Sequence, residues 1–230
     1  MPNGKLIALE GLDGGGKTTQ CHLLVDYLTL NNIPVTIYPL YRHDIVEVML
    51  ERLDETDYIS NIGSRYAVIS KVLCRQEWEI KNKLSKGEYV ILDKFLLTFF
   101  ATEMVRGCSL EELMMATSDV LSPDITFCFD IDPEVALKRK KRIGYRESGL
   151  DIAKYKGERV NYSLFKENGY PNEWLQEQYV DFQTKLRQIL MKLINHNKHK
   201  WGNVTNLDCH TDSLLIHEAI KKKIIALTFK

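Results

Sequence analysis

The feature that most constrains this chain is a run of glycines between a strand-like stretch and a helix-like stretch. Residues 5–10 are nearly all apolar and are typical of a short buried strand. The segment 11–18 then reads Gly-Leu-Asp-Gly-Gly-Gly-Lys-Thr, which fits G-x-x-x-x-G-K-[ST] without a mismatch, and an apolar stretch begins near Cys21. Strand, glycine loop and helix in this order are the context that a phosphate-binding P-loop requires.

The residue types in this loop suit contact with a polyphosphate. Glycines let backbone N–H groups approach phosphate oxygens, and the start of the following helix adds positive charge. Lys17 is expected to reach the terminal phosphates, and the Thr18 hydroxyl to ligate Mg²⁺. The motif therefore predicts binding of a nucleoside triphosphate, and by itself it leaves the reaction open. The residues expected to contact the triphosphate are Gly11, Leu12, Asp13, Gly14, Gly15, Gly16, Lys17, Thr18 and Thr19.

A second signal lies at the end of the run Tyr-Val-Ile-Leu-Asp over 89–93. Asp93 closes a β-rich stretch, as does the Walker B acid that holds Mg²⁺ directly or through water, so we expect it to join Thr18 at the metal. Lys94 follows and points to the same crevice, where a cation can neutralise charge on a transferring phosphoryl group.

The rest of the chain alternates between strand and helix patterns. This alternation predicts an α/β fold, a five-stranded parallel sheet with helices on both faces, in a single domain spanning 1–230. A capping box, Ser109 with Glu112, marks one helix start, and Gly87 is a plausible helix stop. Expected strands after 5–10 are 35–38, 89–93, 125–131 and 204–207. Expected helices follow the P-loop and cover about 44–53, 62–86, 110–121, a stretch from 134, 173–195 and 213–227.

Composition narrows the class of partner. The 31 basic and 31 acidic residues give zero net charge, so nothing draws the whole chain to nucleic acid or to an anionic membrane. No apolar run is long enough to span a bilayer, and no signal peptide precedes the first strand. The five cysteines lack C-x-x-C spacing and are odd in number, which indicates reduced thiols and a cytoplasmic protein.

A basic segment interrupts the α/β pattern at about 138–172. It begins Lys-Arg-Lys-Lys-Arg over 138–142, and Arg146 follows. A charge run of this kind is often only a solvated helix face, and a nucleic-acid-binding arm would be basic as well, although interleaved aromatic residues are sparse. Beside a P-loop we favour a lid that closes over the triphosphate, excludes water and places Arg139, Arg142 and Arg146 on the γ-phosphate.

Residues 10–20, Glu-Gly-Leu-Asp-Gly-Gly-Gly-Lys-Thr-Thr-Gln, resemble the signature E-G-x-D-G-x-G-K-[ST]-T-Q of thymidylate kinases. Segments 80–93, 129–137 and 207–209 also resemble that family, in the same order. The resemblance implies strand order 2-3-1-4-5 and the Mg²⁺-dependent reaction of ATP with dTMP to give ADP and dTDP. It also implies small-molecule nucleotide substrates and a homodimer.

The resemblance also implies roles for individual residues. Asp13 would face the acceptor nucleotide and the metal. In this family the lid supplies an arginine when the residue after that aspartate is not one, and here that residue is Gly14 while the lid carries Arg139, Arg142 and Arg146.

Departures from the family pattern fall on the acceptor side. The third strand usually ends D-R-[YH]-x-x-S, whereas Lys94 and Thr98 stand here, and lysine lacks the bidentate fork of arginine. The family's helix arginine is replaced by a leucine, and Arg75 is the nearest arginine, two residues on. The F-P-x-R loop survives loosely, with Tyr38 and Arg42 as candidates for the acceptor nucleotide.

Two other functions fit the same motifs. A deoxynucleoside or other small-molecule kinase would phosphorylate a hydroxyl and would need a carboxylate base near Glu10 or Asp13. A regulatory protein could bind nucleotide without turnover. The departures bear on thymine specificity more than on kinase chemistry, so a nucleoside monophosphate kinase is the leading hypothesis.

Overall fold

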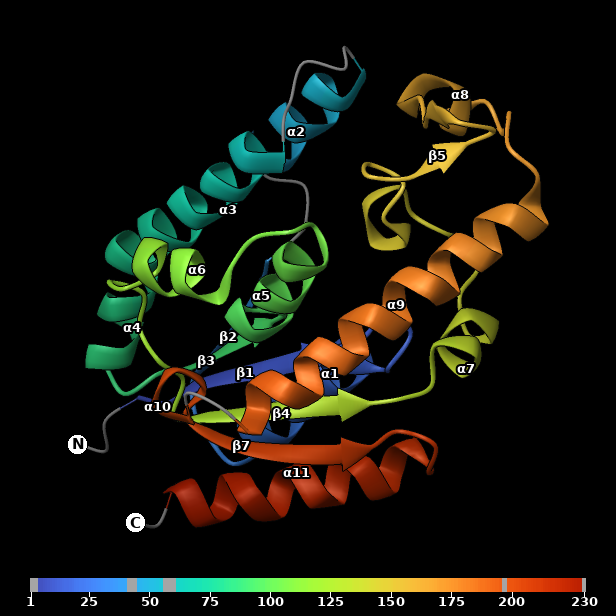
Figure 1. Cartoon of the computed structure of the whole chain (residues 1–230). Coiled ribbons are helices and arrows are strands. Elements are labelled where there is room, and N and C mark those ends of the chain that lie inside the picture. Colours follow the sequence, from blue (N-terminus) through green and yellow to red (C-terminus); the bar gives the residue numbers. More distant parts are fainter. Residues whose placement is uncertain (1–3, 41–44, 56–60, 196–197, 229–230) are drawn as a thin grey trace.

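A twisted sheet of five parallel strands forms the centre of the molecule (Figure 1). The computed structural model describes residues 4–40, 45–55, 61–195 and 198–228. The sheet order is β2-β3-β1-β4-β7, which confirms the predicted order 2-3-1-4-5, since the two short strands β5 and β6 lie outside this sheet. Its strands are β1 (Leu6–Gly11), β2 (Val35–Pro39), β3 (Tyr89–Asp93), β4 (Ile125–Asp130) and β7 (Asn203–Asp208).

The central strands of the sheet are buried on both faces, which explains why their sequences are continuous apolar runs. β1 lies between β3 and β4, with Ile7 opposite Ile91 on one side and Ile125 on the other. Every residue of β1 is buried, because helices cover both faces of the sheet. All strands point the same way, so their carboxyl ends meet at one edge, where ligands bind in open α/β sheets.

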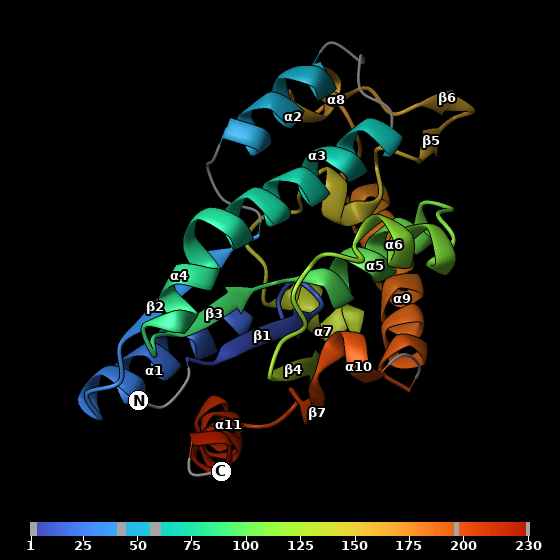
Figure 2. The same cartoon turned by 90° about the vertical axis from the view of Figure 1, so that its left-hand side faces the viewer.

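Helices pack on the two faces of this sheet (Figure 2). On one face α1 (Lys17–Leu30) contacts β1, β2 and β3 and lies beside α11 (Ser213–Thr228). On the other, α5 (Leu96–Val105) contacts β1 and packs along α9 (Asn172–Asn195). No described helix is long and apolar enough to cross a membrane.

The predicted long helix 62–86 is present as three consecutive pieces with a π-helical turn in the middle. The pieces are α3 (Asn61–Arg75), the π-helix η1 (Gln76–Ile80) and α4 (Lys81–Ser85). The stop at Gly87 is confirmed, since this residue has φ +80°. The expected helix at 44–53 is α2 (Ile45–Glu55), and the one from 134 is α7 (Pro133–Lys138).

In the middle of the chain one predicted helix is shorter than expected and one helix was missed. The helix predicted over 110–121 is α6 (Leu110–Ala116); its capping box from Ser109 and Glu112 is confirmed, but the Thr117 hydroxyl bonds the Leu113 carbonyl and a turn follows. The buried helix α5 was not predicted, because a helix covered on nearly all sides has only a narrow row of polar residues and hence a weak 3.6-residue periodicity.

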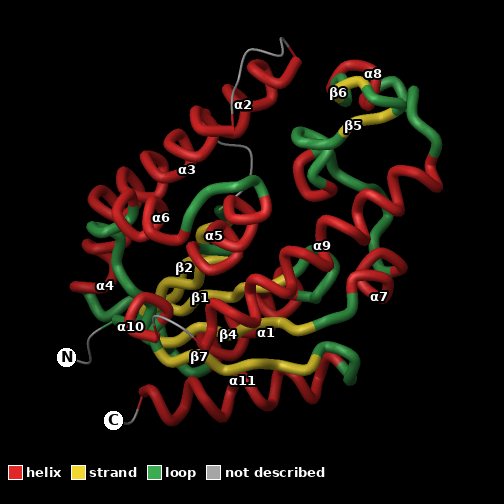
Figure 3. Tube along the Cα trace, viewed as in Figure 1, coloured by secondary structure: helices red, strands yellow, loops and turns green. Residues whose placement is uncertain are grey.

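The basic segment folds around a small apolar core of its own. Its elements are η2 (Arg146–Ser148), the hairpin of β5 (Lys154–Tyr155) and β6 (Glu158–Arg159), and α8 (Tyr162–Lys166), and Figure 3 shows the hairpin and α8 at a distance from the main sheet. The ring of Tyr145 packs edge-on against Tyr162 with centroids 4.9 Å apart, and Tyr155 packs in the same manner against Tyr170. Although α8 and α2 are far apart in the sequence, α8 contacts α2. The basic segment therefore faces the helices α2 and α3 (Figure 1). The remaining short helix, α10 (Lys198–Trp201), precedes β7.

Candidate active site

The glycine loop turns as tightly as its composition predicts. A Cβ at Gly11 (φ +126°) would stand 2.4 Å from the Phe129 carbonyl oxygen, and one at Gly14 (φ +89°) 2.6 Å from that of Ala136. Only glycine therefore fits at these two positions. The loop ends where α1 begins, at Lys17. The side chain of Lys17 is buried, and its Nζ donates to the Leu12 carbonyl at 2.6 Å.

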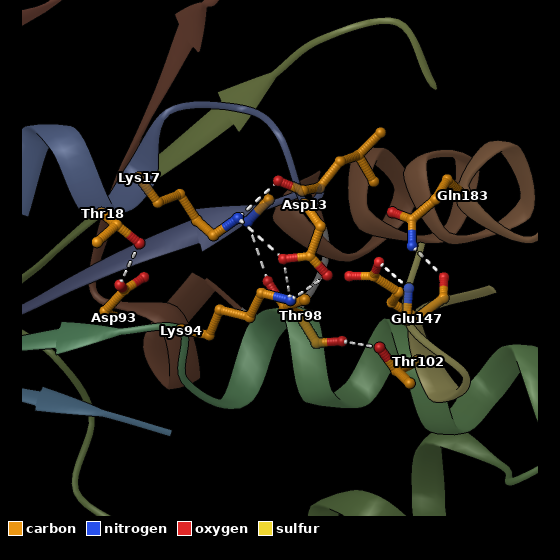
Figure 4. A network of polar contacts seen from close by, with 12 residues as sticks. Asp13, Lys17, Thr18, Asp93, Lys94, Thr98, Thr102, Glu147 and Gln183 are labelled. Carbon is orange, nitrogen blue, oxygen red and sulfur yellow. Dashed lines mark hydrogen bonds and ion pairs between the residues drawn. The ribbon is translucent and has the colours of Figure 1, made fainter. Parts of the chain in front are cut away.

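Thr18 and Asp93 meet as expected. The Thr18 hydroxyl donates to Asp93 Oδ2 at 2.7 Å, across the gap between the start of α1 and the end of β3 (Figure 4). Both residues line the same cavity as the P-loop. A hydroxyl and a carboxylate are the hard oxygen ligands that Mg²⁺ takes beside phosphate oxygens.

Asp13 forms the centre of a charged cluster. Lys94 Nζ lies 2.7 Å from its carboxylate and Lys17 Nζ lies 3.9 Å away. Burial alone would raise the pKa of Asp13, but the two ammonium groups outweigh it and hold the pKa below its usual range. Lys94 reaches this position from a left-handed backbone, φ +60°, which is costly for a residue with a side chain.

Glu10 does structural work next to this cluster. Its carboxylate accepts hydrogen bonds from the backbone N–H groups of Leu97 at 2.8 Å and Thr98 at 3.1 Å, at the start of α5. The Thr98 hydroxyl in turn accepts from the Gly11 N–H at 2.9 Å. Burial raises the pKa of Glu10, and these hydrogen bonds oppose the rise. The side chain of Glu10 thus joins the glycine loop to α5.

One cavity of about 970 Å³ connects the glycine loop to the helices of the far wall. One end of this cavity is formed by the P-loop and the start of α1. Its other walls come from α3 through Ser64 and Val68, from α5, from α9 and from Tyr145 and Tyr162 of the basic segment. The lining residues of α5 and α9 are Thr98, Phe99, Thr102, Glu103, Phe182, Gln183 and Leu186.

A buried ion-pair network supports the far wall. Glu103 accepts from Arg65 of α3 at 2.9 Å and from Arg106 at 3.0 Å. Arg106 also pairs with Asp151 of the basic segment at 2.8 Å and lies over the Phe182 ring. Because positive and negative charges are matched and nearly fully buried, the network ties α3, α5 and the basic segment together.

The predicted site residues divide into two groups. The cavity is lined by the predicted P-loop residues other than Leu12, together with Asp93, Lys94, Thr98, Arg139 and Arg146. Arg139 also donates to the Cys209 carbonyl at 3.0 Å, at the edge of β7.

Four predicted residues that the structure describes do not line the cavity: Leu12, Tyr38, Arg75 and Arg142. Arg142 is exposed and is absent from the lining. Arg75 donates to the Pro39 carbonyl at 2.9 Å and covers the Tyr38 ring, so these two side chains engage each other outside the described lining. Arg42 lies outside the described residues.

Sequence reasoning found Thr98 but missed the other residues that α5 contributes, and it missed the contribution of α9. Thr98, Thr102 and Arg106 recur at intervals of four and place polar groups on one side of an otherwise apolar helix. That spacing was the available signal for α5. For Gln183, near the middle of the long α9, a single sequence offers no comparable signal.

Together, the parallel sheet, the glycine loop at the end of its central strand and the charged cavity define a P-loop kinase, an α/β enzyme that transfers a phosphoryl group. The model of the thymidylate kinase family matches residues 9–210. The chain therefore belongs to the thymidylate kinase family and is a nucleotide kinase.

Curated relatives agree with this assignment. The thymidylate kinase of Chlorobium limicola is 29% identical over 94% of this chain and 92% of its own length. That of Caldanaerobacter subterraneus is 31% identical over 69% of this chain and 80% of its own length. A probable thymidylate kinase 2 of Saccharolobus solfataricus is 28% identical over 65% of this chain and 71% of its own length.

Proposed function

We propose that this enzyme transfers the γ-phosphoryl group of ATP to dTMP, giving ADP and dTDP, with Mg²⁺. The observation that carries the proposal is the single cavity that runs from the P-loop to the wall of α3, α5 and α9. Its volume of about 970 Å³ lies at the upper end of the usual range for ligand sites and suits two nucleotides placed end to end.

The donor phosphates belong on the glycine loop. Residues 11–19 surround them, and Lys17 balances the charge that develops on the transferring group. Thr18 and Asp93 would hold Mg²⁺, which neutralises charge on the phosphates when bound. Arg139 and Arg146 face the same cavity and are the lid residues to which we assign contacts with the transferring phosphoryl group. Arg142 receives no such role, because it does not line the cavity.

The acceptor phosphate belongs near Lys94. This side chain and Asp13 lie between the start of α1 and the part of the cavity beside α9, so Lys94 can hold an incoming phosphate. The Thr98 hydroxyl accepts from the Gly11 N–H and links α5 to the loop. A phosphate acceptor is already anionic and needs no strong general base.

The same geometry disfavours a kinase that phosphorylates a hydroxyl. Glu10 is committed to the backbone of α5 and does not line the cavity, and Asp13 has a lowered pKa that makes it a weak base. Glu103 lines the cavity but is paired with two arginines. A monophosphate acceptor therefore suits the site better than a nucleoside.

A substrate panel tests the proposal. ADP release is measured by a coupled assay with dTMP, dUMP, dGMP and thymidine as acceptors, each with and without Mg²⁺. We expect dTMP to give the highest kcat/KM and thymidine to give only the ATPase background. A rate with another acceptor and none with dTMP would show that the thymidylate assignment is wrong.

We also propose a homodimer in the cytoplasm. Ile62 and Tyr66 of α3 and Trp78 of η1 are 60%, 55% and 83% exposed along consecutive helical segments, and we take this surface as the candidate dimer interface. The five cysteines are free, as expected in a reducing compartment. Light scattering coupled to gel filtration tests the dimer, and Trp78→Glu should shift the protein toward the monomer if this surface is the interface.

A further inference from the structure

A glutamine of α9 presents a hydrogen-bond acceptor that no described residue satisfies. Gln183 is only 1% exposed and lines the cavity. Its Nε2 donates to the Glu147 carbonyl at 2.6 Å. Its Oε1 is the one buried side-chain nitrogen or oxygen of the described residues that has no hydrogen-bond partner. Such atoms are rare in folded proteins, and each calls for an explanation, which at the wall of a ligand cavity includes a donor group that arrives with the ligand.

The orientation of this amide is determined by its neighbour. A backbone carbonyl only accepts hydrogen bonds, so the nitrogen of Gln183 must face Glu147 and the oxygen must face away from it. Figure 4 shows the oxygen turned toward the side of the cavity where Asp13 lies. One turn earlier in α9, the Tyr179 hydroxyl donates to the Asp13 carbonyl at 2.8 Å, which holds the helix at this distance from the P-loop.

The position of Gln183 assigns it to the acceptor rather than to the donor. In Figure 4, Lys17, Thr18 and Asp93 lie on one side of Asp13, whereas Gln183 lies on the other side with Glu147 and Thr102. Phosphate groups are not the partners of this atom, because a carbonyl-type oxygen needs an N–H or O–H donor. The acceptor nucleotide offers two such donors, the imide N3–H of the base and the 3′-hydroxyl of the sugar.

We propose that Gln183 is a specificity-determining residue whose Oε1 accepts a hydrogen bond from an N–H or O–H group of the acceptor nucleotide. The proposal rests on the proposed function, since it takes a nucleoside monophosphate as the second ligand. Oε1 is shielded from water in the free enzyme, so the wall beside it must yield slightly when the donor arrives. A ligand without the donor leaves the oxygen unpaired, and sites built this way discriminate strongly.

The test compares three ligands on three proteins by titration calorimetry. The ligands are dTMP, its N3-methyl derivative and its 3′-deoxy derivative. The proteins are the wild type, Gln183→Met and the control Gln76→Met. Gln76 is a matched control because it is equally buried, with its amide bonded to the backbone of Asp119 and Leu121, and it does not line the cavity.

We expect the wild type to bind one of the two derivatives about tenfold more weakly than dTMP, as for the loss of one hydrogen bond. Gln183→Met should bind that derivative and dTMP equally, while Gln76→Met keeps the wild-type ratio and unfolds at a lower temperature. The derivative that loses affinity identifies the donor.

Two results would overturn the proposal. One is a wild type that binds all three ligands within a factor of two, which needs no variant to fold. The other is a Gln183→Met protein that keeps the wild-type ratios for both derivatives. Failure of the proposed function looks different: dTMP binds but no ADP is released in the coupled assay, while the binding ratios still test Gln183.

Discussion

Lys94 is the residue at which backbone strain, electrostatics and catalysis can be separated by mutation. Its φ of +60° is in the left-handed region, which costs a residue with a side chain about 1–2 kcal/mol. Its ammonium group lies 2.7 Å from the Asp13 carboxylate. A comparison of Lys94→Ala, Lys94→Gly and Lys94→Arg therefore changes one contribution at a time.

The expected change in stability follows from these two terms. Lys94→Ala keeps the strain and loses the ion pair, while Lys17 at 3.9 Å still screens Asp13. The two paired side chains are 16% and 24% exposed, so the loss falls below the 3–5 kcal/mol of a fully buried pair, and we expect about 1–2 kcal/mol. Lys94→Gly loses the same pair but relieves the strain, so it should be about 1 kcal/mol more stable than Lys94→Ala.

Activity should follow charge and not strain. Lys94→Ala and Lys94→Gly remove the same cation from the acceptor phosphate, and we expect both to lose about 10²–10³ in kcat. Lys94→Arg keeps the charge and should retain most of the rate. The assays are urea unfolding followed by fluorescence and coupled ADP release with dTMP.

The pH dependence gives a third check. Lys94 and Lys17 hold the pKa of Asp13 below its usual value of 3.8, so the ion-pair contribution to stability is present above that pH and is lost as the pH falls through the lowered pKa. The stability difference between wild type and Lys94→Ala should therefore shrink in acid. Equal stability of the Ala and Gly variants would refute the strain argument, and wild-type kcat in either would refute the role of Lys94.

Three further predictions concern the scaffold. Ser109→Ala removes the capping box of α6 and should lower the free energy of unfolding by about 1 kcal/mol, measured by urea titration. Gly149→Ala should destabilise the basic segment, because a Cβ there would lie 2.2 Å from the Phe182 ring in a left-handed conformation; unchanged thermal unfolding would contradict this. In the native protein only Cys74, the one exposed cysteine, should react quickly with a thiol reagent, and burial raises the pKa of Cys128 to about 12, so mass spectrometry should find it unmodified until the protein unfolds.

Much of the fold could be predicted because it depends on local signals. The glycine loop, the strands around it and the capping box at Ser109 each follow from the chemistry of a few adjacent residues. The helix α5 was harder to predict, because burial on nearly all sides reduces to a narrow row the polar face by which a helix is recognised in a sequence. The π-helical turn at Gln76–Ile80 is likewise set by packing and leaves no pattern.

The site followed the same division. Thr18 and Asp93 could be predicted because Thr18 lies at the start of the helix after the P-loop and Asp93 lies at the end of the neighbouring strand β3. The topology of the sheet alone brings these two positions together. The acceptor side depends on how α3, α5 and the basic segment approach one another, which no spacing encodes. Arg75 illustrates the difference: a basic residue near the expected position turns instead to the Pro39 carbonyl and the Tyr38 ring.

Glu10 shows why the two halves of the site are built as one unit. Its backbone belongs to the strand that leads into the P-loop, and its carboxylate holds the first N–H groups of α5, the helix that lines the acceptor side. The Gly11 N–H completes the link through the Thr98 hydroxyl. A shift of α5 would break these buried hydrogen bonds, each costly to leave unmade, so the acceptor wall is held in register with the phosphate loop. In-line phosphoryl transfer needs such fixed placement of two ligands, because the protein contributes position and charge more than covalent chemistry.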